Sequence, residues 1–160
     1  MPRAIAAREA CAAKAMKSLT GRKSWTDKLR APARVAIKPA PMDIAGMRKG
    51  EVMLVPTPAL IDAFMRELPA GRHVGVREMR RELASRHGAE VTCPIYTGYH
   101  VRTVAEAAYE ALQRGEAEDR ITPFWRVLDL DSPTTSRLAC GAEFVRERRA
   151  REGLPERSGG

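Results

Sequence analysis

The sequence predicts a mainly α-helical domain with a small β component. Four segments with the apolar pattern of helices follow residue 56, and each is bounded by residues that start or stop helices. A short apolar run precedes them at 51–55, and a longer one over 121–130 is expected to be extended. With 160 residues, the chain has room for one domain with a substantial core and one appendage.

The first helix is expected directly after Thr57. Its hydroxyl can accept a hydrogen bond from the first helical turn, and Pro58 suits the first helical position because it has no N–H to satisfy. Residues 69–71, Pro-Ala-Gly, should end this helix. Its inward face would carry Leu60, Ile61, Phe64 and Leu68.

Three further helices are predicted by spacing and stop signals. One covers about 76–87 before Gly88, one about 97–114, and one about 141–152. Their inward residues are Val76, Met79 and Leu83, then Val101, Val104, Ala105, Ala108 and Leu112, then Phe144 and Val145. Two consecutive helices followed by an extended apolar segment are typical of a helix-turn-helix with a wing. We therefore expect a winged-helix-like domain over 51–160.

The positive charge is concentrated before that domain. Residues 1–50 hold 12 Lys and Arg against 3 Asp and Glu, whereas residues 51–160 hold 16 Arg against 17 Asp and Glu. Residues 1–50 are thus expected to form a basic arm, with an Ala-rich helix over 3–18 and a Pro-containing linker over 22–50. Such an arm can bind phosphates or act as a solubilising tail.

Several classes of protein are disfavoured. No apolar run approaches the ~20 residues of a membrane span, and the charged N-terminus does not form a secretory signal. Three cysteines, Cys11, Cys93 and Cys140, do not make a disulfide framework, so we expect a cytoplasmic location. We expect no cofactor and no metal, because His87, Cys93 and His100 lack a paired ligand motif.

Four motifs carry a resemblance to a known family. Residues 123–128, Pro-Phe-Trp-Arg-Val-Leu, resemble the Pro-Cys-His-Arg-Val signature of the O6-alkylguanine-DNA alkyltransferases. They are closer to the alkyltransferase-like proteins, in which an aromatic residue replaces the cysteine. Residues 68–74, 101–105 and 151–154 resemble the family's IPxGxV, ARAVG and LLxxEG motifs in the same order. The similarity spans about residues 53–154.

The resemblance implies a protein that does not transfer alkyl groups. In the enzymes a thiolate, activated through a histidine and a glutamate, takes the alkyl group. Here Phe124 occupies the cysteine position and Trp125 the histidine position, and neither ring can accept an alkyl group. Glu152 remains at the glutamate position and is expected to be structural.

The resemblance also implies how duplex DNA would be bound. Arg102 occupies the position of the family's intercalating arginine, and Thr97 and Tyr99 belong to the same recognition helix. Arg80 and Arg81 on the preceding helix are candidates for phosphate contacts, or for pairing with Glu78 and Glu82. Glu106, one turn after Arg102, could instead hold that arginine in an ion pair, and the family's nucleotide-rotating tyrosine is missing near Val76.

Phe124, Trp125 and Arg126 are the candidates for a pocket that receives an extruded base. Stacking on such rings is worth ~1–3 kcal/mol per base. The alternative for the two rings is a place in the core, and Arg126 could simply anchor a loop through backbone carbonyls.

The sequence therefore predicts a non-catalytic DNA-binding protein that recognises O6-alkylguanine or another base lesion, with double-stranded DNA and other repair proteins as partners and no membrane association. One alternative is a plain winged-helix DNA-binding protein, such as a transcription or nucleoid factor. Another is an alkyltransferase with Cys93 or Cys140 as a relocated acceptor. The third alternative is a protein–protein adaptor that does not bind DNA.

Overall fold

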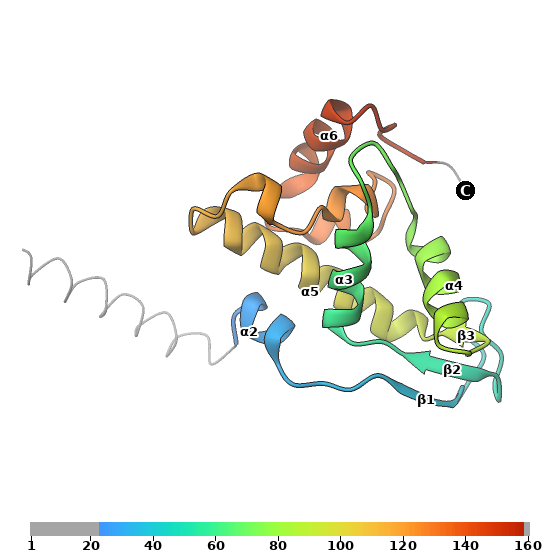
Figure 1. Ribbon diagram of the computed structural model, residues 1–160. Helices are drawn as coiled ribbons and strands as arrows, with labels where there is room; N and C mark the ends of the chain where they lie inside the picture. Colours follow the sequence, from blue (N-terminus) through green and yellow to red (C-terminus); the bar gives the residue numbers. More distant parts are fainter. Residues whose placement is uncertain (1–22, 159–160) are drawn as a thin grey trace, which may run out of the picture.

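The computed structural model describes residues 23–158, and the helix predicted over 3–18 lies outside the described residues. This part of the chain is mainly helical with one small sheet (Figure 1). The helices are α2 (Trp25–Arg30), α3 (Pro58–Glu67), α4 (Val76–Arg86), α5 (Pro94–Gln113) and α6 (Gly141–Arg151). The strands are β1 (Ala36–Pro39), β2 (Val52–Val55) and β3 (Val91–Thr92), and short 3-10 turns cover Glu118–Arg120, Phe124–Arg126 and Thr135–Arg137.

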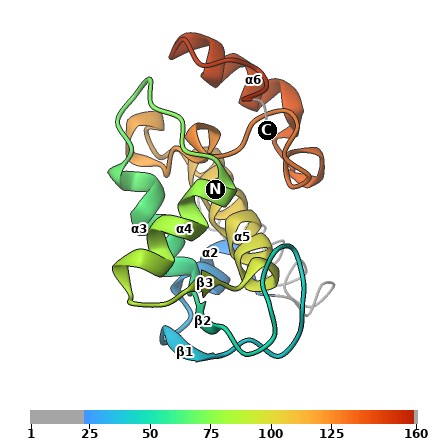
Figure 2. The same cartoon turned by 90° about the vertical axis from the view of Figure 1, so that its right-hand side faces the viewer.

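Helix α5 is the central element of the domain. Helices α2 and α3 pack against it, and Figures 1 and 2 show it running through the middle of the fold. The predicted apolar face of this helix is buried at Val101, Val104, Ala105 and Ala108. Because these side chains join the residues of α3, α4 and α6 in one core, the second half of α5 is fixed while its first turns reach the surface.

The sheet positions the beginning of α5. Strand β1 pairs antiparallel with β2, with Ala36 opposite Val55, and β2 pairs in parallel with β3, with Met53 opposite Val91. The Cys93 N–H extends the last pairing by donating to the Leu54 carbonyl at 2.9 Å. The chain then enters α5 at once, so the sheet holds the first turn of this helix in place.

The predicted helices are largely confirmed, with one shifted start. Thr57 caps α3 by accepting a hydrogen bond from the Leu60 N–H at 3.1 Å, as its position predicts. Helix α5 begins at Pro94, three residues before the predicted start, because proline suits the first helical turn. Among the described residues, no helix is long and apolar enough to cross a membrane.

The predicted domain boundary at residue 50 is wrong for residues 23–50. Glu110 of α5 accepts hydrogen bonds from the backbone N–H groups of Trp25 and Thr26 at 3.0 and 3.1 Å, which docks α2 on the core. Strand β1 forms the edge of the sheet and tolerates Pro39 there, since a proline at an edge removes no ladder hydrogen bond. The segment that was expected to be a linker is part of the domain.

The segment 121–130 is not extended as predicted. Phe124–Arg126 forms a 3-10 turn, in which Val127 N–H donates to the Phe124 carbonyl. Consecutive side chains in a strand point to opposite faces, whereas this turn brings the rings of Phe124 and Trp125 into one cluster, 5.5 Å apart between centroids. The expected wing after the third helix is therefore not formed by these residues.

Candidate functional site

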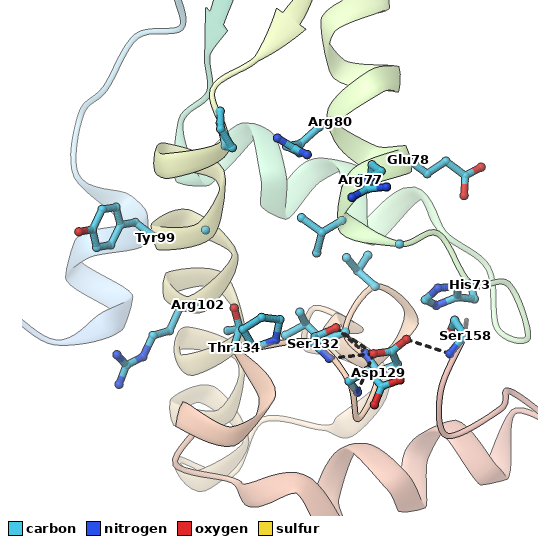
Figure 3. A pocket seen from close by; sticks show the side chains of 18 of the residues that line it. His73, Arg77, Glu78, Arg80, Tyr99, Arg102, Asp129, Ser132, Thr134 and Ser158 are labelled. Atoms are coloured by element: carbon cyan, nitrogen blue, oxygen red, sulfur yellow. Dashed lines mark hydrogen bonds between the residues drawn. The ribbon is translucent and has the colours of Figure 1, made fainter. Parts of the chain in front are cut away.

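A large cleft opens between α4, the start of α5 and the loop 127–134. Its volume is about 1080 Å³, just above the range of ordinary small-molecule sites. Figure 3 shows Arg77 and Arg80 projecting from α4 on one side of α5 and Tyr99 projecting on the other. The charged and aromatic residues of its walls are His73, Arg77, Glu78, Arg80, Arg81, Tyr99, Arg102, Asp129, Asp131 and Arg137.

Four of the five arginines that line this cleft have no counter-charge among the described residues. Arg77, Arg80 and Arg81 lie on one face of α4, at helical spacing, and Arg137 also lines the cleft. Among residues 23–158, none of these four forms an ion pair, although nine other arginines do. The neighbouring Glu82, a possible partner of Arg81 by sequence, pairs with Arg86 instead.

The pKa of Arg80 reflects this concentration of positive charge. Burial lowers the pKa of its guanidinium below the ordinary value, and the charges of Arg77 and Arg81 lower it further. Like charges held this close repel one another and attract anions. The α4 wall of the cleft is therefore a positively charged surface suited to phosphate or another anionic group.

The opposite wall is a rigid loop built around Asp129. Its carboxylate accepts hydrogen bonds from the backbone N–H groups of Asp131, Ser132 and Ser158, each at 2.9 Å. Burial alone would raise the pKa of Asp129, but these hydrogen bonds outweigh it and hold the pKa below its ordinary value. Because this carboxylate is already satisfied, it serves the loop and the C-terminal segment and not a ligand.

His73 lies at the edge of the cleft next to a buried arginine. Arg149, fully buried, donates one guanidinium N–H to the Trp125 carbonyl at 2.7 Å and approaches His73 Nδ1 at 3.1 Å. Burial lowers the pKa of His73, and the charge of Arg149 lowers it further. The Nδ1 atom is thus an acceptor, which leaves the proton of the neutral ring on Nε2.

Tyr99 and Arg102, both predicted to contact DNA, occupy the rim of the cleft. The Tyr99 side chain is 69% exposed. Arg102 is partly exposed but held: its guanidinium carbon lies 5.2 Å from the Trp25 ring centroid, and one nitrogen lies 3.9 Å from Glu106. The Arg102 Nε is buried with no hydrogen-bond partner among the described residues.

Thr97 cannot contact DNA as predicted. The residue is completely buried, and its hydroxyl donates to the Cys93 carbonyl at 2.7 Å. Thr97 lies one turn before Val101, on the same buried face of α5, so its side chain points into the core.

The predicted base pocket does not form around Phe124 and Trp125. Phe124 is 0% exposed and Trp125 is 5% exposed, and neither lines the cleft. Both rings pack against Phe144, at centroid distances of 5.7 and 6.3 Å. An aromatic cluster of this kind buries a large apolar area, so the rings stabilise the core and are closed to an incoming base.

Arg126, the third residue of the predicted pocket, anchors the turn that carries these rings. Its guanidinium contacts the Glu152 carboxylate at 2.7 Å and donates to the Leu68 carbonyl at 2.7 Å. Glu152 also accepts a hydrogen bond from Trp125 Nε1 at 3.1 Å. Burial alone would raise the pKa of Glu152, but the hydrogen bonds from Arg126, Trp125 and the Gly71 N–H hold it below the ordinary value.

The two cysteines of the described region are poor candidates for a nucleophile. Cys93 is 4% exposed and lies in a small apolar cluster with Met47 and Met53. Burial, with the nearby charge of Glu106, raises the pKa of Cys140 to about 11. Among residues 23–158, no group of three His, Cys, Asp or Glu side chains is placed to hold a metal ion.

Sequence reasoning missed three contributors to the cleft and its rim. Arg77 precedes Arg80 and Arg81 by three and four positions, a helical spacing that could have placed all three on one face. Arg137 gave no signal, because it follows a loop whose course depends on the fold. The contact of Trp25 with Arg102 joins residues far apart in the sequence, which no local pattern reveals.

No family model, curated protein or solved structure matches the chain.

Proposed function

We propose that the protein binds duplex DNA without catalysing a reaction on it, with α4 and α5 acting as the helix-turn-helix pair of a winged-helix-like domain. The observation that carries this proposal is the face of α4 on which Arg77, Arg80 and Arg81 lie with no counter-charge from residues 23–158, beside the exposed first turns of α5.

The arginine-bearing wall of the cleft is suited to bind the phosphates of a DNA duplex. Arginines that contact phosphates release condensed counterions, and this supplies most of the sequence-independent affinity for DNA. Phosphate contacts fix the register of the protein, while an exposed helix reads or deforms the bases. Gly98 supports a close approach of α5, because outside the adjacent helix backbone no heavy atom lies within 4 Å of the position that a Cβ would occupy there.

The turn at Phe124 supports the part of the proposal that says the protein does not catalyse a reaction on DNA. In the alkyltransferases that the sequence resembles, these positions hold a cysteine and a histidine, and a glutamate orients the histidine. The Glu152 carboxylate does accept a hydrogen bond from the ring at the histidine position, but that ring is Trp125, and the cysteine position holds a buried phenyl group. The resemblance and the geometry together favour a retained scaffold with no nucleophile.

A relocated cysteine is the alternative that this proposal excludes. Incubation with DNA containing O6-methylguanine, followed by mass spectrometry of the intact protein, tests it. We expect no gain in mass, because the Cys140 thiol, with a pKa of about 11, is almost entirely protonated at neutral pH, and Cys93 is buried. A permanent gain of one methyl group on any cysteine would contradict the proposal.

The cleft also favours a more specific function, the accommodation of an extruded nucleotide. Its floor includes the apolar side chains of Val76, Val127 and Leu128, and its volume of about 1080 Å³ exceeds that of one nucleotide. The cleft, and not the predicted pocket of aromatic rings, would then receive the extruded nucleotide. The affinities for duplexes with and without O6-methylguanine test it: a preference for the lesion is expected, and equal affinities would leave only general DNA binding.

Fluorescence anisotropy with a labelled duplex at low salt tests the main proposal. Replacing Arg77, Arg80 and Arg81 together by glutamine should weaken binding at least about 100-fold, since a charge-assisted contact is worth ~1.5 kcal/mol or more. The matched control replaces Arg66, Arg146 and Arg151, which are exposed and already paired with carboxylates. It should bind within about threefold of the wild type. Equal losses in both variants would show that total charge, and not this surface, determines binding.

A further inference from the structure

The first turns of α5 form a ridge between two hollows. Ile95 and Tyr99 line the arginine-rich cleft on one side, and both also line a second hollow of about 340 Å³ on the other. The second hollow is mainly apolar, with Lys38 at its edge, and its apolar lining includes Met42, Met47 and Met53. The ridge of Ile95 and Tyr99 is thus the part of α5 that stands between two recessed surfaces.

Tyr99 is the most prominent residue of this ridge. At 69% exposure it is the most exposed large apolar side chain among residues 23–158. The rings of Tyr96 and Tyr109 contact His100 and Phe144, respectively, whereas the Tyr99 ring has no such contact within the described part of the chain. A ring left in water beside the exposed Ile95 is available for contact with a partner.

Charge identifies the kind of partner. The unpaired arginines of α4 flank the ridge on one side, and the exposed Lys38 flanks it on the other. An apolar protein surface would gain nothing from these cations. A duplex offers phosphates on both strands for the two flanks and a stack of bases for the ridge between them.

The residue that the family resemblance would assign to this task is poorly placed for it. Arg102 lies over the Trp25 ring and beside Glu106, and one of its nitrogens is 3.4 Å from the Arg137 carbonyl. Entering the DNA would require Arg102 to leave these contacts. Tyr99, one turn earlier on the same helix, has no such contacts to give up within the described part of the chain.

We propose that Tyr99, backed by Ile95, is the wedge that enters the base stack of a bound duplex. This rests on the proposed DNA binding and adds which side chain deforms the bases. Apolar and aromatic side chains inserted at a base step unstack it and kink the duplex, while the flanking cations hold the two strands. Arg102 then acts from behind the ridge by fixing α2 against α5.

The test uses a short duplex with 2-aminopurine at its centre, whose fluorescence rises when the base is unstacked. The wild-type protein should bind it and raise the fluorescence several-fold. Tyr99→Ala should abolish most of the rise while the affinity, measured on the same samples by anisotropy, falls less than about tenfold. Tyr99→Phe should keep the rise, because stacking needs the ring and not the hydroxyl.

Two matched variants make the result specific. Tyr96→Ala removes a ring of the same type on the same helix turn that does not line the larger cleft, and it should leave the rise intact. Arg102→Ala should leave it intact as well. A rise that disappears in Arg102→Ala and persists in Tyr99→Ala would overturn the assignment of the wedge.

The failure of this proposal can be told from the failure of the proposed function. If the wild type binds the duplex and the fluorescence does not rise, the wedge is wrong and DNA binding stands. If the wild type shows no binding at low salt, both are wrong. In that case, capture of a protein partner by the wild type and not by Tyr99→Ala would identify the ridge as a protein-binding surface.

Discussion

Charged residues differ between two regions of the molecule, the turn at Phe124 and the cleft beside α4: arginines are paired in the first and, among residues 23–158, mostly unpaired in the second. At the turn, Arg126 is matched by Glu152 and a carbonyl, and the buried Arg149 donates to several backbone oxygens. At the cleft, Arg77, Arg80 and Arg81 have no counter-charge among the described residues. The first region uses its cations for structure, whereas the second leaves them available.

This difference separates the segment that carries the sequence resemblance from the cleft, which we propose to be the binding surface. The Pro-Phe-Trp-Arg segment carries the clearest motif of the sequence, yet its aromatic rings are buried and its polar groups are hydrogen-bonded. The cleft has no comparable signature, yet it is open and positively charged on one wall. Substitutions in the two regions should therefore have different consequences for stability and for binding.

The largest effect on stability is expected from Phe124→Ala. Truncating a fully buried phenylalanine removes its contacts with Trp125 and Phe144 and leaves a cavity, which costs about 3–5 kcal/mol. Urea unfolding followed by circular dichroism measures this free energy. A loss below about 1 kcal/mol would mean that the ring is not part of the core.

Glu152→Ala should come next, at roughly 3 kcal/mol. The change leaves the half-buried guanidinium of Arg126 and the indole N–H of Trp125 without their acceptor. Replacement of Glu152 by Gln keeps an acceptor and should lose less stability than the alanine variant. The same unfolding experiment checks both, and an equal loss in the two would contradict the role of the hydrogen bonds.

A smaller effect is expected from pH. The pKa of His73 is lowered in the folded protein by burial and by Arg149, and Asp129 and Glu78 only partly oppose this. The unfolded chain therefore takes up the proton first, and stability should fall as the pH drops from about 6.5 through the lower pKa of the folded state. His73→Gln should flatten this part of the stability profile, and an unchanged profile would exclude His73 as its source.

The smallest effect on stability should come from the cleft itself. Replacing Tyr99 by Ala, or Arg77 and Arg81 by Gln, removes exposed groups with no ion pair among the described residues, so the free energy of unfolding should stay within about 0.5 kcal/mol. Relief of repulsion between the arginines should favour the double variant slightly. A loss above about 2 kcal/mol would show that these side chains serve the fold.

The sequence was informative where local rules act. Thr57 and Pro58 mark the start of α3 correctly, and the apolar spacing of α5 predicts its buried face. The turn at 124–126 was missed because burying two adjacent rings on the same side is a tertiary demand that a short apolar run does not reveal. The docking of α2 was missed because its acceptor, Glu110, lies far away in the sequence.

The candidate site was predictable only in part. Tyr99, Arg80 and Arg81 line the cleft as members of helices that the sequence predicts. Phe124 and Trp125 were misplaced because the residues of a motif carry no information about whether a pocket remains beside them. The far wall depends on Asp129 holding a loop to the C-terminal segment, an arrangement that only the assembled fold defines.

The salt dependence of duplex binding tests the central claim most directly. Removing one arginine–phosphate pair should reduce the slope of log K against log salt concentration by about 0.9. The variant lacking Arg77, Arg80 and Arg81 should therefore have a slope shallower than the wild type by roughly 2.7, whereas the control variant lacking Arg66, Arg146 and Arg151 should keep the wild-type slope. Equal slopes for all three proteins would contradict the claim that the unpaired arginines of the cleft hold DNA.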